Sequence, residues 1–298
     1  MAEGAAPSVG DGGEAQHALA ALYSSLPSAP LRHVLSFHYG LTSDDAAVDE
    51  VLLPEWVNVR FVLRGDWHWQ PVGGMQVGLA EASLCGASSG GVRIMAPPGA
   101  SMIGFGLLPL GWALLSGGPV NQIVDRVVPL VEVWPELAAL HPALVAAPDM
   151  ASRVEMLEGA VMARLETAPA APPLLADILQ LLGQSDVKTT AALAARLGIS
   201  LRTLERLCEA LLGFGPKRLM RRQRFLRTVD SMLGTPDPPL SALIAGDYVD
   251  QSHFIREFRA FMGLSPTEYL ALPREVMRRA MRARWQLRGQ SVPAHAPR

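Results

Sequence analysis

Two short segments in the last third of the 298-residue chain carry side chains that can read nucleotide bases. At helical spacing, the first holds Arg202, Thr203, Glu205, Arg206 and Glu209, and the second holds Gln251, Ser252, Ile255, Arg256 and Arg259. An arginine guanidinium can donate two hydrogen bonds to guanine, and a glutamine amide can pair with adenine. The chemistry on offer is therefore recognition by hydrogen bonding in a groove, without covalent steps.

Both segments belong to a repeat with an offset of 50 residues. The register holds without a gap, pairing Leu193 with Leu243, Ser200 with Asp250, Leu204 with Phe254, Arg206 with Arg256, Cys208 with Phe258, Leu211 with Phe261, Gly213 with Gly263 and Pro216 with Pro266. Self-similarity at a fixed offset indicates two copies of one structural unit.

Each copy has the pattern of a helix-turn-helix. In the first copy a short helix is predicted over residues 190–197, followed by a two-residue turn and a second helix. Ser200 and Asp250 can cap the second helices, each cap contributing about 1 kcal/mol. Gly213 and Gly263 suit a left-handed helix end. The stripe expected to pack on the preceding helix is Leu204, Leu207, Cys208 and Leu211.

A long amphipathic helix is predicted between the copies, opening at Pro216 and spanning roughly 25 Å over residues 217–233. Its apolar seam is Leu219, Leu226, Val229 and Leu233, and its other sides carry Lys217, Arg218, Arg221, Arg222, Arg224 and Arg227. Such a strut could hold two reading helices about 34 Å apart, which is one duplex turn. Both helices could then enter successive major grooves without a dimer.

Residues 186–272 resemble the DNA-binding domain of the AraC/XylS transcription regulators. In the second copy the resemblance rests on residues 250–258 (Asp-Gln-Ser-His-Phe-Ile-Arg-Glu-Phe) and 263–269 (Gly-Leu-Ser-Pro-Thr-Glu-Tyr). In the first copy it rests on residues 193–194, 197–200, 202–204 and 213–217. The resemblance implies base contacts from Arg202, Glu205 and Arg206, and from Gln251, Ser252, Ile255 and Arg256. It implies no catalytic residue.

The resemblance therefore implies a sequence-specific regulator of transcription that binds double-stranded DNA. Lys217, Arg218 and Arg221 are expected to contact phosphates, which positions a protein without specifying sequence. Ser200, Thr203 and His253, at the starts of the reading helices, complete the predicted DNA-binding set. RNA polymerase is a candidate partner, and the sequence leaves open a monomer or a homodimer.

The second copy departs from the family pattern just before its reading helix. The segment there is one residue shorter than usual, and Asp247 stands where the family has a glycine. Ile244 aligns with the smaller Ala194 of the first copy. A bulky residue at a close helix crossing is expected to splay the second unit.

Charge divides the chain into two unlike parts. Residues 1–185 hold 7 Lys and Arg against 18 Asp and Glu, whereas residues 186–298 hold 19 against 10. The charges of −11 and +9 are concealed by the net −2. Because Lys and Arg supply most sequence-independent affinity for nucleic acid by neutralising phosphates, a polyanionic partner is expected for the second part.

The acidic part is expected to form a small sheet or half-barrel, because it consists of short β-prone runs set off by Gly and Pro. These runs are residues 31–39, 56–63, 67–69, 75–80 and 101–108. It resembles, less specifically, the N-terminal half-barrel of some AraC-type regulators, through residues 91–94, 98–100, 104–109, 111–112 and 125–128. In relatives such a region senses a small-molecule effector or mediates association, and both roles stay open here.

We therefore predict an α+β chain. Its parts are a flexible N-terminus (1–20), a β-rich sensing or regulatory domain (21–134), a helical linker region (135–185), an all-α DNA-binding domain with two helix-turn-helix units joined by a long helix (186–272) and a basic C-terminal tail (273–298). Arginines continue into the tail (Arg274, Arg278, Arg279, Arg282, Arg284 and Arg288), as either a solvated helix face or extra phosphate contacts.

Membrane insertion is disfavoured. Residues 94–124 carry no charge and exceed the roughly 20 residues of a spanning helix, but prolines and glycines divide them into shorter pieces. A buried strand and a short helix are expected there instead. The first residues lack the basic and apolar regions of a secretion signal, and only two cysteines occur, which favours a cytoplasmic location.

An enzyme is the competing class of function. A metal site needs clustered ligands, but His68 stands alone between two tryptophans, and His33 and His38 are five residues apart. We predict no metal, cofactor or catalytic residue, and interpret Trp56, Trp67 and Trp69 as packing residues. The alternative is a ligand-binding or catalytic β-domain whose helical half serves oligomerisation.

Overall fold

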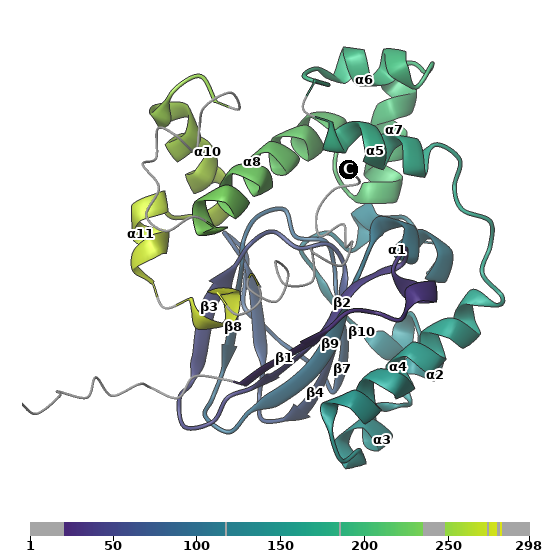
Figure 1. Cartoon of the computed structure of the whole chain (residues 1–298), viewed down its shortest axis with the longest axis vertical. Helices are drawn as coiled ribbons and strands as arrows, with labels where there is room; N and C mark the ends of the chain where they lie inside the picture. Colours follow the sequence, from purple (N-terminus) through teal and green to yellow (C-terminus); the bar gives the residue numbers. More distant parts are fainter. Residues whose placement is uncertain are drawn as a thin grey trace, which may run out of the picture.

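The structure, a computed structural model, describes residues 21–116, 118–184, 186–234, 248–272, 274–278 and 281. The N-terminal part consists of two antiparallel sheets and no closed barrel, and the C-terminal part is helical, so the predicted α+β class is confirmed (Figure 1). The segment predicted to be a flexible N-terminus lies outside the described residues.

The larger sheet has six strands. Their order is β1 (Ala21–Ser25), β2 (Leu35–Thr42), β9 (Ser101–Leu107), β4 (Asn58–Arg64), β7 (Ala82–Cys85) and β10 (Val127–Pro129). The smaller sheet has the order β3 (Val48–Leu52), β8 (Val92–Ala96), β5 (His68–Pro71) and β6 (Val77–Gly78). The uncharged stretch 94–124 forms the end of β8, all of β9, helix α1 (Pro109–Leu115) and a 3-10 turn, η2 (Val120–Gln122).

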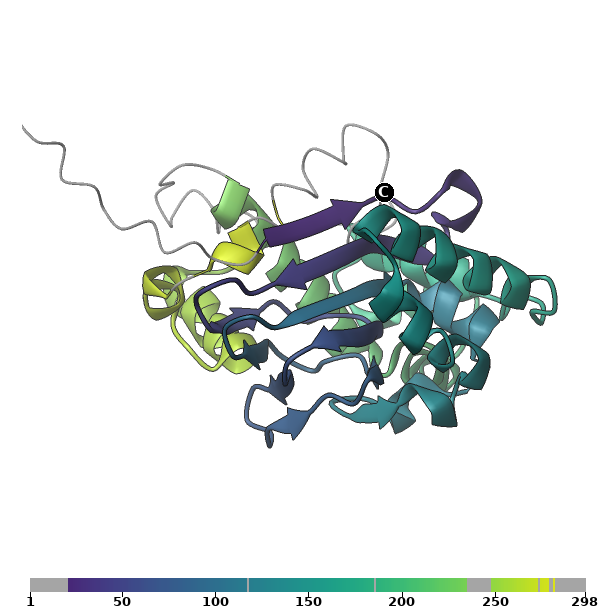
Figure 2. The same cartoon turned by 90° about the horizontal axis from the view of Figure 1, so that it is seen from below.

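Helices α2 (Pro135–Ala138), α3 (His141–Ala146), α4 (Met150–Leu165) and α5 (Leu175–Gly183) follow the sheets. The C-terminal module holds α6 (Thr190–Arg196), α7 (Leu201–Leu212), α8 (Pro216–Gly234), α10 (Gln251–Met262) and α11 (Pro266–Ala271). Figure 1 shows α8 running between α10 on one side and α6 and α7 on the other, with the strands below. Figure 2, from below, shows strands between the yellow-green C-terminal helices and the teal helices.

Two hydrophobic cores join the N-terminal sheets to the C-terminal helices. The first contains Phe105 of the larger sheet together with Leu204 and Cys208 of α7. The second contains Trp69 of the smaller sheet together with Phe225 of α8 and Phe258 of α10. Because each helix-turn-helix unit shares a core with the sheets, apolar burial fixes both units to the N-terminal part.

None of the helices in the described ranges has the length and apolar character that a bilayer-spanning segment requires. Trp67 and Trp69 are buried in the second core, which agrees with their interpretation as packing residues. Both cysteines, Cys85 and Cys208, are buried free thiols.

Candidate nucleic-acid interface

The first helix-turn-helix has the predicted geometry. The Thr189 hydroxyl accepts the amide of Ala192 at 3.1 Å at the start of α6, and the Ser200 hydroxyl accepts the amide of Thr203 at 3.1 Å at the start of α7. Gly213 ends α7 in the left-handed region with φ of 82°. The buried stripe of α7 is Leu204, Cys208 and Leu212, while Leu207 and Leu211 are half-buried.

The second reading helix repeats these features. The Asp250 carboxylate accepts the amide of His253 at 2.7 Å at the start of α10, and Gly263 ends the helix with φ of 71°. Both caps and both glycine ends confirm what the repeat predicts. The departures at Ile244 and Asp247 lie outside the described residues.

The side chains predicted to read bases lie on the outer faces of α7 and α10. Arg202, Glu205 and Arg206 of α7 are exposed, as are Gln251, Ser252 and Arg256 of α10 and the cap Ser200. Thr203, His253 and Ile255 are half-buried. The Thr203 hydroxyl lies 2.9 Å from the Ser200 hydroxyl.

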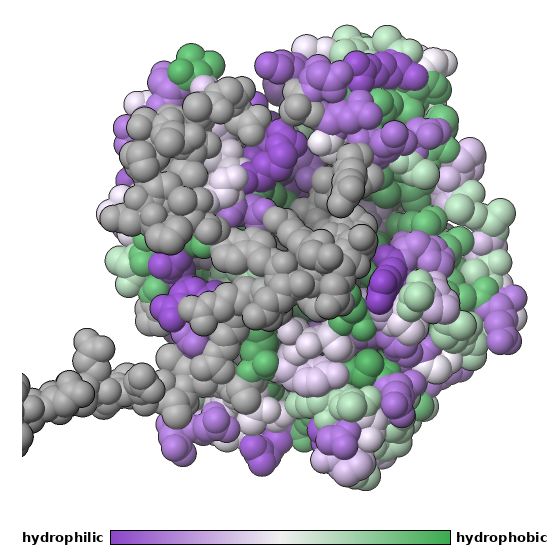
Figure 3. All heavy atoms as spheres, viewed as in Figure 1, coloured by the Kyte–Doolittle hydropathy of each residue, from purple (hydrophilic) through white to green (hydrophobic). Residues whose placement is uncertain are grey.

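Two open clefts flank α8. Residues of α8 and α10 line both clefts, and residues of α7 line one of them. The larger, of about 880 Å³, runs past α8 to α10 and is lined by Arg256 and His253. The smaller, of about 680 Å³, is lined by Glu205 of α7 and Ala260 of α10. Thr190, Lys217 and Arg221 line both clefts, so the two form one continuous surface. In Figure 3 hydrophilic side chains gather over the C-terminal helices.

The larger cleft is basic. Its cationic side chains are Lys188, Lys217, Arg221, Arg224, Arg227 and Arg256, and Glu257 is the one carboxylate among the described residues that line it. A concave surface with this excess of positive charge attracts a polyanion. Lys188, Arg224 and Arg227 were not among the predicted contacts, because their proximity to α10 depends on how the helices pack.

Glu257 is the residue that sequence reasoning missed. It is only 3% exposed, yet its carboxylate contacts the Arg224 guanidinium at 2.6 Å and the Arg221 Nε at 3.4 Å. Burial lowers the pKa of Arg224, but the hydrogen bond and charge of Glu257 outweigh it and raise that pKa. One feature of the sequence could have identified it. Glu257 stands three residues after Phe254, so helical spacing places a carboxylate on the apolar face of α10.

Not all basic residues of α8 face the clefts. Arg222, expected on an outer side of this helix, is 1% exposed and lies over the Trp56 ring at 4.0 Å. Burial lowers its pKa to about 9, and its three guanidinium nitrogens have no hydrogen-bond partner. Arg218 donates to the Ser89 carbonyl at 2.8 Å. The expectation for Arg222 is wrong because the N-terminal part covers that side of α8.

The C-terminal ends of both reading helices are fixed to the N-terminal part. At the end of α7, a β-carbon on Gly213 would lie 2.7 Å from the Val124 side chain. At the end of α10, the Phe261 carbonyl accepts the amide of Gly91 at 2.7 Å. The amino-terminal ends, which carry the predicted base contacts, are the ends left for a ligand.

The first arginines of the C-terminal run lie beside a strand. The Glu50 carboxylate of β3 accepts the amides of Val276 and Met277 at 2.8 and 3.1 Å, and burial raises the pKa of Glu50. Arg278 pairs with Glu275 at 3.3 Å. Residues 274–278 are therefore held against β3 by hydrogen bonds to Glu50. Arg279, Arg282, Arg284 and Arg288 lie outside the residues whose side chains are described.

The residues weighed as metal ligands stay apart. Within the described ranges, no group of three His, Cys, Asp or Glu side chains could hold a metal ion. His38 is buried, with the Glu158 carboxylate at 3.7 Å, and burial lowers its pKa. His68 is half-buried on β5.

Comparison with known proteins identifies the C-terminal module. A family model described as a helix-turn-helix domain matches residues 193–271. No curated protein matches the sequence.

The solved structures that resemble this chain share little sequence identity with it. ToxT from Vibrio cholerae has 12% identity and a TM-score of 0.45, over 84% of this chain and 97% of that chain. ToxT bound to an unsaturated fatty acid has 13% identity and a TM-score of 0.42, over 79% and 94%. The AraC-like transcriptional activator CuxR has 16% identity and a TM-score of 0.30, over 69% and 85%.

The family match runs from within α6 to the end of α11 and includes both capped reading helices and α8. Residues 193–271 are thus a helix-turn-helix domain, as the repeat in the sequence predicts.

Proposed function

We propose that α7 and α10 enter neighbouring major grooves on one face of a DNA duplex, with α8 between them. The observation that carries this proposal is the pair of clefts around α8, which are lined by Glu205 and Glu209 of α7 and by His253 and Arg256 of α10 and share three lining residues. One copy of the chain then spans two grooves. The proposal implies action in the cytoplasm.

Three arginines are the proposed principal base readers: Arg202 and Arg206 from α7, and Arg256 from α10. Further base contacts come from Glu205, Gln251, Ser252 and Ile255. Lys217, Arg218 and Arg221 position the duplex through phosphates, as do Ser200, Thr203 and His253 near the helix starts. The exposed fork of an arginine suits guanine, which presents two acceptors in the major groove.

Substitution of Arg206 by Ala tests the base-reading role. The loss on the preferred site is expected to be about 1 to 3 kcal/mol, with relaxed sequence choice, because a bidentate contact to one base is removed. Sites are first selected from a random duplex pool, and affinities are then measured on selected and random duplexes. Arg126→Ala removes an exposed arginine from the N-terminal part as a matched control. Equal losses on both duplexes would contradict base reading by Arg206.

Salt dependence separates this proposal from the enzyme alternative. For about six phosphate contacts, affinity for duplex DNA should fall about a thousandfold between 50 and 200 mM salt. The titration uses the full chain, since both helix-turn-helix units share cores with the sheets. Absence of duplex binding at low salt would instead favour a β-domain protein whose helices serve oligomerisation.

We also propose that the N-terminal region binds a small-molecule effector. Buried donors without acceptors favour this role, because such groups are costly unless something pairs with them. They are the indole nitrogens of Trp67 and Trp69 in the smaller-sheet core. A panel of small carboxylic acids should include one that raises the melting temperature of wild type and raises that of Trp69→Phe less. No stabilisation by any member would count against an acidic effector.

The proposal also includes association of the chain with other proteins. RNA polymerase and a second copy of the chain are candidate partners. Sedimentation of the full chain with a duplex carrying one selected site distinguishes one bound copy from two. One bound copy is expected, because two reading helices are present in each chain.

A further inference from the structure

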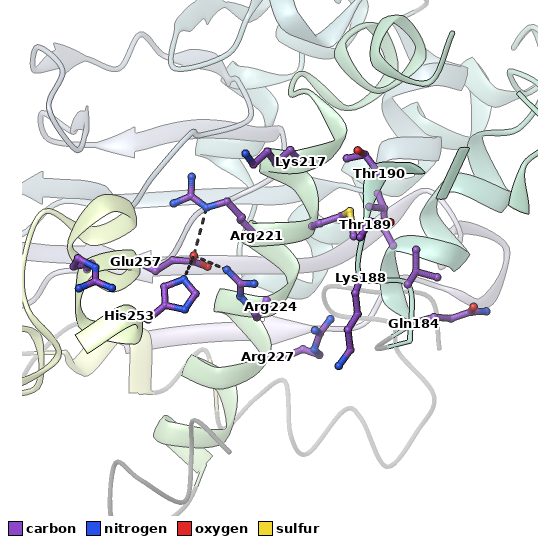
Figure 4. A pocket seen from close by; sticks show the side chains of 14 residues that line it. Gln184, Lys188, Thr189, Thr190, Lys217, Arg221, Arg224, Arg227, His253 and Glu257 are labelled. Carbon is purple, nitrogen blue, oxygen red and sulfur yellow. Dashed lines mark hydrogen bonds and ion pairs between the residues drawn. The ribbon is translucent and has the colours of Figure 1, made fainter. Parts of the chain in front are cut away.

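The floor of the larger cleft holds a carboxylate surrounded by potential DNA contacts. The Glu257 Oε2 atom lies 2.6 Å from an Arg224 nitrogen, 3.4 Å from the Arg221 Nε and 3.8 Å from the His253 Nε2. The Tyr248 hydroxyl lies 3.3 Å from Oε1. Figure 4 shows Arg221, Arg224 and His253 converging on this carboxylate from α8 and α10.

The two arginines are held from below but remain open to the cleft. The Arg221 side chain is 44% exposed and the Arg224 side chain is 27% exposed, whereas Glu257 is 3% exposed. Aromatic rings fix both, with Arg221 over Phe261 at 5.8 Å and Arg224 over Tyr248 at 4.8 Å. A phosphate in the cleft would therefore meet cations that already have a carboxylate partner.

We propose that Glu257 is a specificity-determining residue, which competes with DNA phosphates for Arg221 and Arg224 and so weakens sequence-independent binding. This inference rests on the proposed function of the cleft. Binding to random sequence consists essentially of phosphate contacts, and a loosely seated duplex can shift to use every available cation. A duplex seated by base contacts has a fixed position and benefits less from the release of two arginines. Glu257 thereby favours the selected site over random DNA.

Substitution of Glu257 by Gln tests the proposal, because Gln keeps the shape and removes the charge. Affinity for a random duplex should rise, and the slope of log affinity against log salt should steepen by about 0.9 for each additional phosphate that the protein neutralises. Each such phosphate adds about a threefold loss of affinity between 50 and 200 mM salt. The ratio of selected-site to random affinity should fall. Unchanged or weaker random binding with an unchanged slope would overturn the proposal.

Three further variants separate charge competition from structural damage. Tyr248→Phe removes a hydroxyl beside the same carboxylate without changing charge, and it should leave the salt slope unchanged. Glu257→Leu places here the residue type that the first copy has at Leu207, and it should steepen the slope as Glu257→Gln does. Arg224→Gln should remove part of the increase in random-duplex affinity in the Glu257→Gln background but change the wild-type slope little. Additive effects in this cycle would mean that Glu257 does not act through Arg224.

The wild-type titration distinguishes failure of this inference from failure of the proposed function. If wild type binds duplex DNA with a steep salt dependence and Glu257→Gln loses affinity in parallel on both duplexes, Glu257 is only structural. If wild type shows no duplex binding at low salt, the cleft is not a DNA site and both proposals fail.

Discussion

The two reading helices share one backbone design but have different interiors. Helices α7 and α10 each have 12 residues, a side-chain cap at the start and a glycine with positive φ at the end. The buried face of α7 is mainly aliphatic, whereas α10 buries Phe254, Phe258 and Phe261. The repeat therefore specifies where each helix begins and ends, and the surface beneath each helix determines the size of its buried side chains.

The partners of the two helices explain this difference. Helix α7 packs mainly on η2, beside the larger sheet, and also contacts α6, α8 and α1. Helix α10 packs on α8. The centroid of the Phe225 ring of α8 lies 4.7 Å from that of Phe261 and 5.4 Å from that of Phe258. A cluster of rings supplies the larger buried area that this contact needs.

One equivalent pair differs in charge. An offset of 50 places Glu257 opposite Leu207, which is half-buried against the first core. Glu257 instead meets two arginines of α8. The same helix position thus serves packing in the first copy and electrostatics in the second.

The largest effect on the free energy of unfolding is expected at the equivalent positions Phe258 and Cys208, which are both fully buried. Phe258→Ala should lower the free energy of unfolding by about 3 to 5 kcal/mol, because the ring is lost and a cavity is left. Cys208→Ala should cost about 1 kcal/mol, since one thiol is removed. Denaturant titrations measure both values, and similar losses would mean that the interiors of the two units do not differ in energy.

Arg256 and Arg206 compare the two units in DNA binding. Arg256→Ala should cost about 1 to 3 kcal/mol on the selected site, as expected for Arg206→Ala, if both helices read bases. The two losses should map to base positions about one duplex turn apart in a selection experiment. Loss of preference at a single region for both variants would contradict reading by two grooves.

Substitutions at the glycines that follow α6 and α7 test the contact between the end of α7 and the N-terminal part. Gly198 and Gly213 both have positive φ, but a β-carbon would meet nothing within 4 Å at Gly198 and would lie 2.7 Å from the Val124 side chain at Gly213. Gly198→Ala should cost about 1 to 2 kcal/mol from backbone strain alone, and Gly213→Ala should cost more. Equal shifts in thermal unfolding would show that the contact with Val124 adjusts freely.

Helix caps should give the smallest effects. Ser200→Ala and Asp250→Ala each remove one hydrogen bond to a backbone amide, at 3.1 and 2.7 Å. Each should cost about 1 kcal/mol of unfolding free energy, with the carboxylate cap worth slightly more because it also interacts with the helix dipole. Ser200→Asp is the matched exchange and should retain the stability of wild type in the same thermal and denaturant titrations.

Several strands followed from sequence and others did not. The β-prone runs identify β2, β4, β5, β6 and β9, although the first run starts with a 3-10 turn at Ala29–Leu31, where Pro30 fixes φ. Strands β1, β3, β7, β8 and β10 were missed. β3 contains Asp49 and Glu50, which weakened its apolar pattern. Glu50 is buried because it caps a segment more than 200 residues away.

The sequence by itself determined the features that local hydrogen bonds control. The caps at Ser200 and Asp250 and the left-handed glycines depend on residues within one turn, so spacing alone locates them.

Only the tertiary structure decided the partners of charged side chains. Arg222 and Arg221 stand one residue apart on α8, yet one is buried over Trp56 and the other lines the basic clefts. Neighbouring residues on a helix point about 100° apart, and which direction meets the sheets depends on how the whole helix packs.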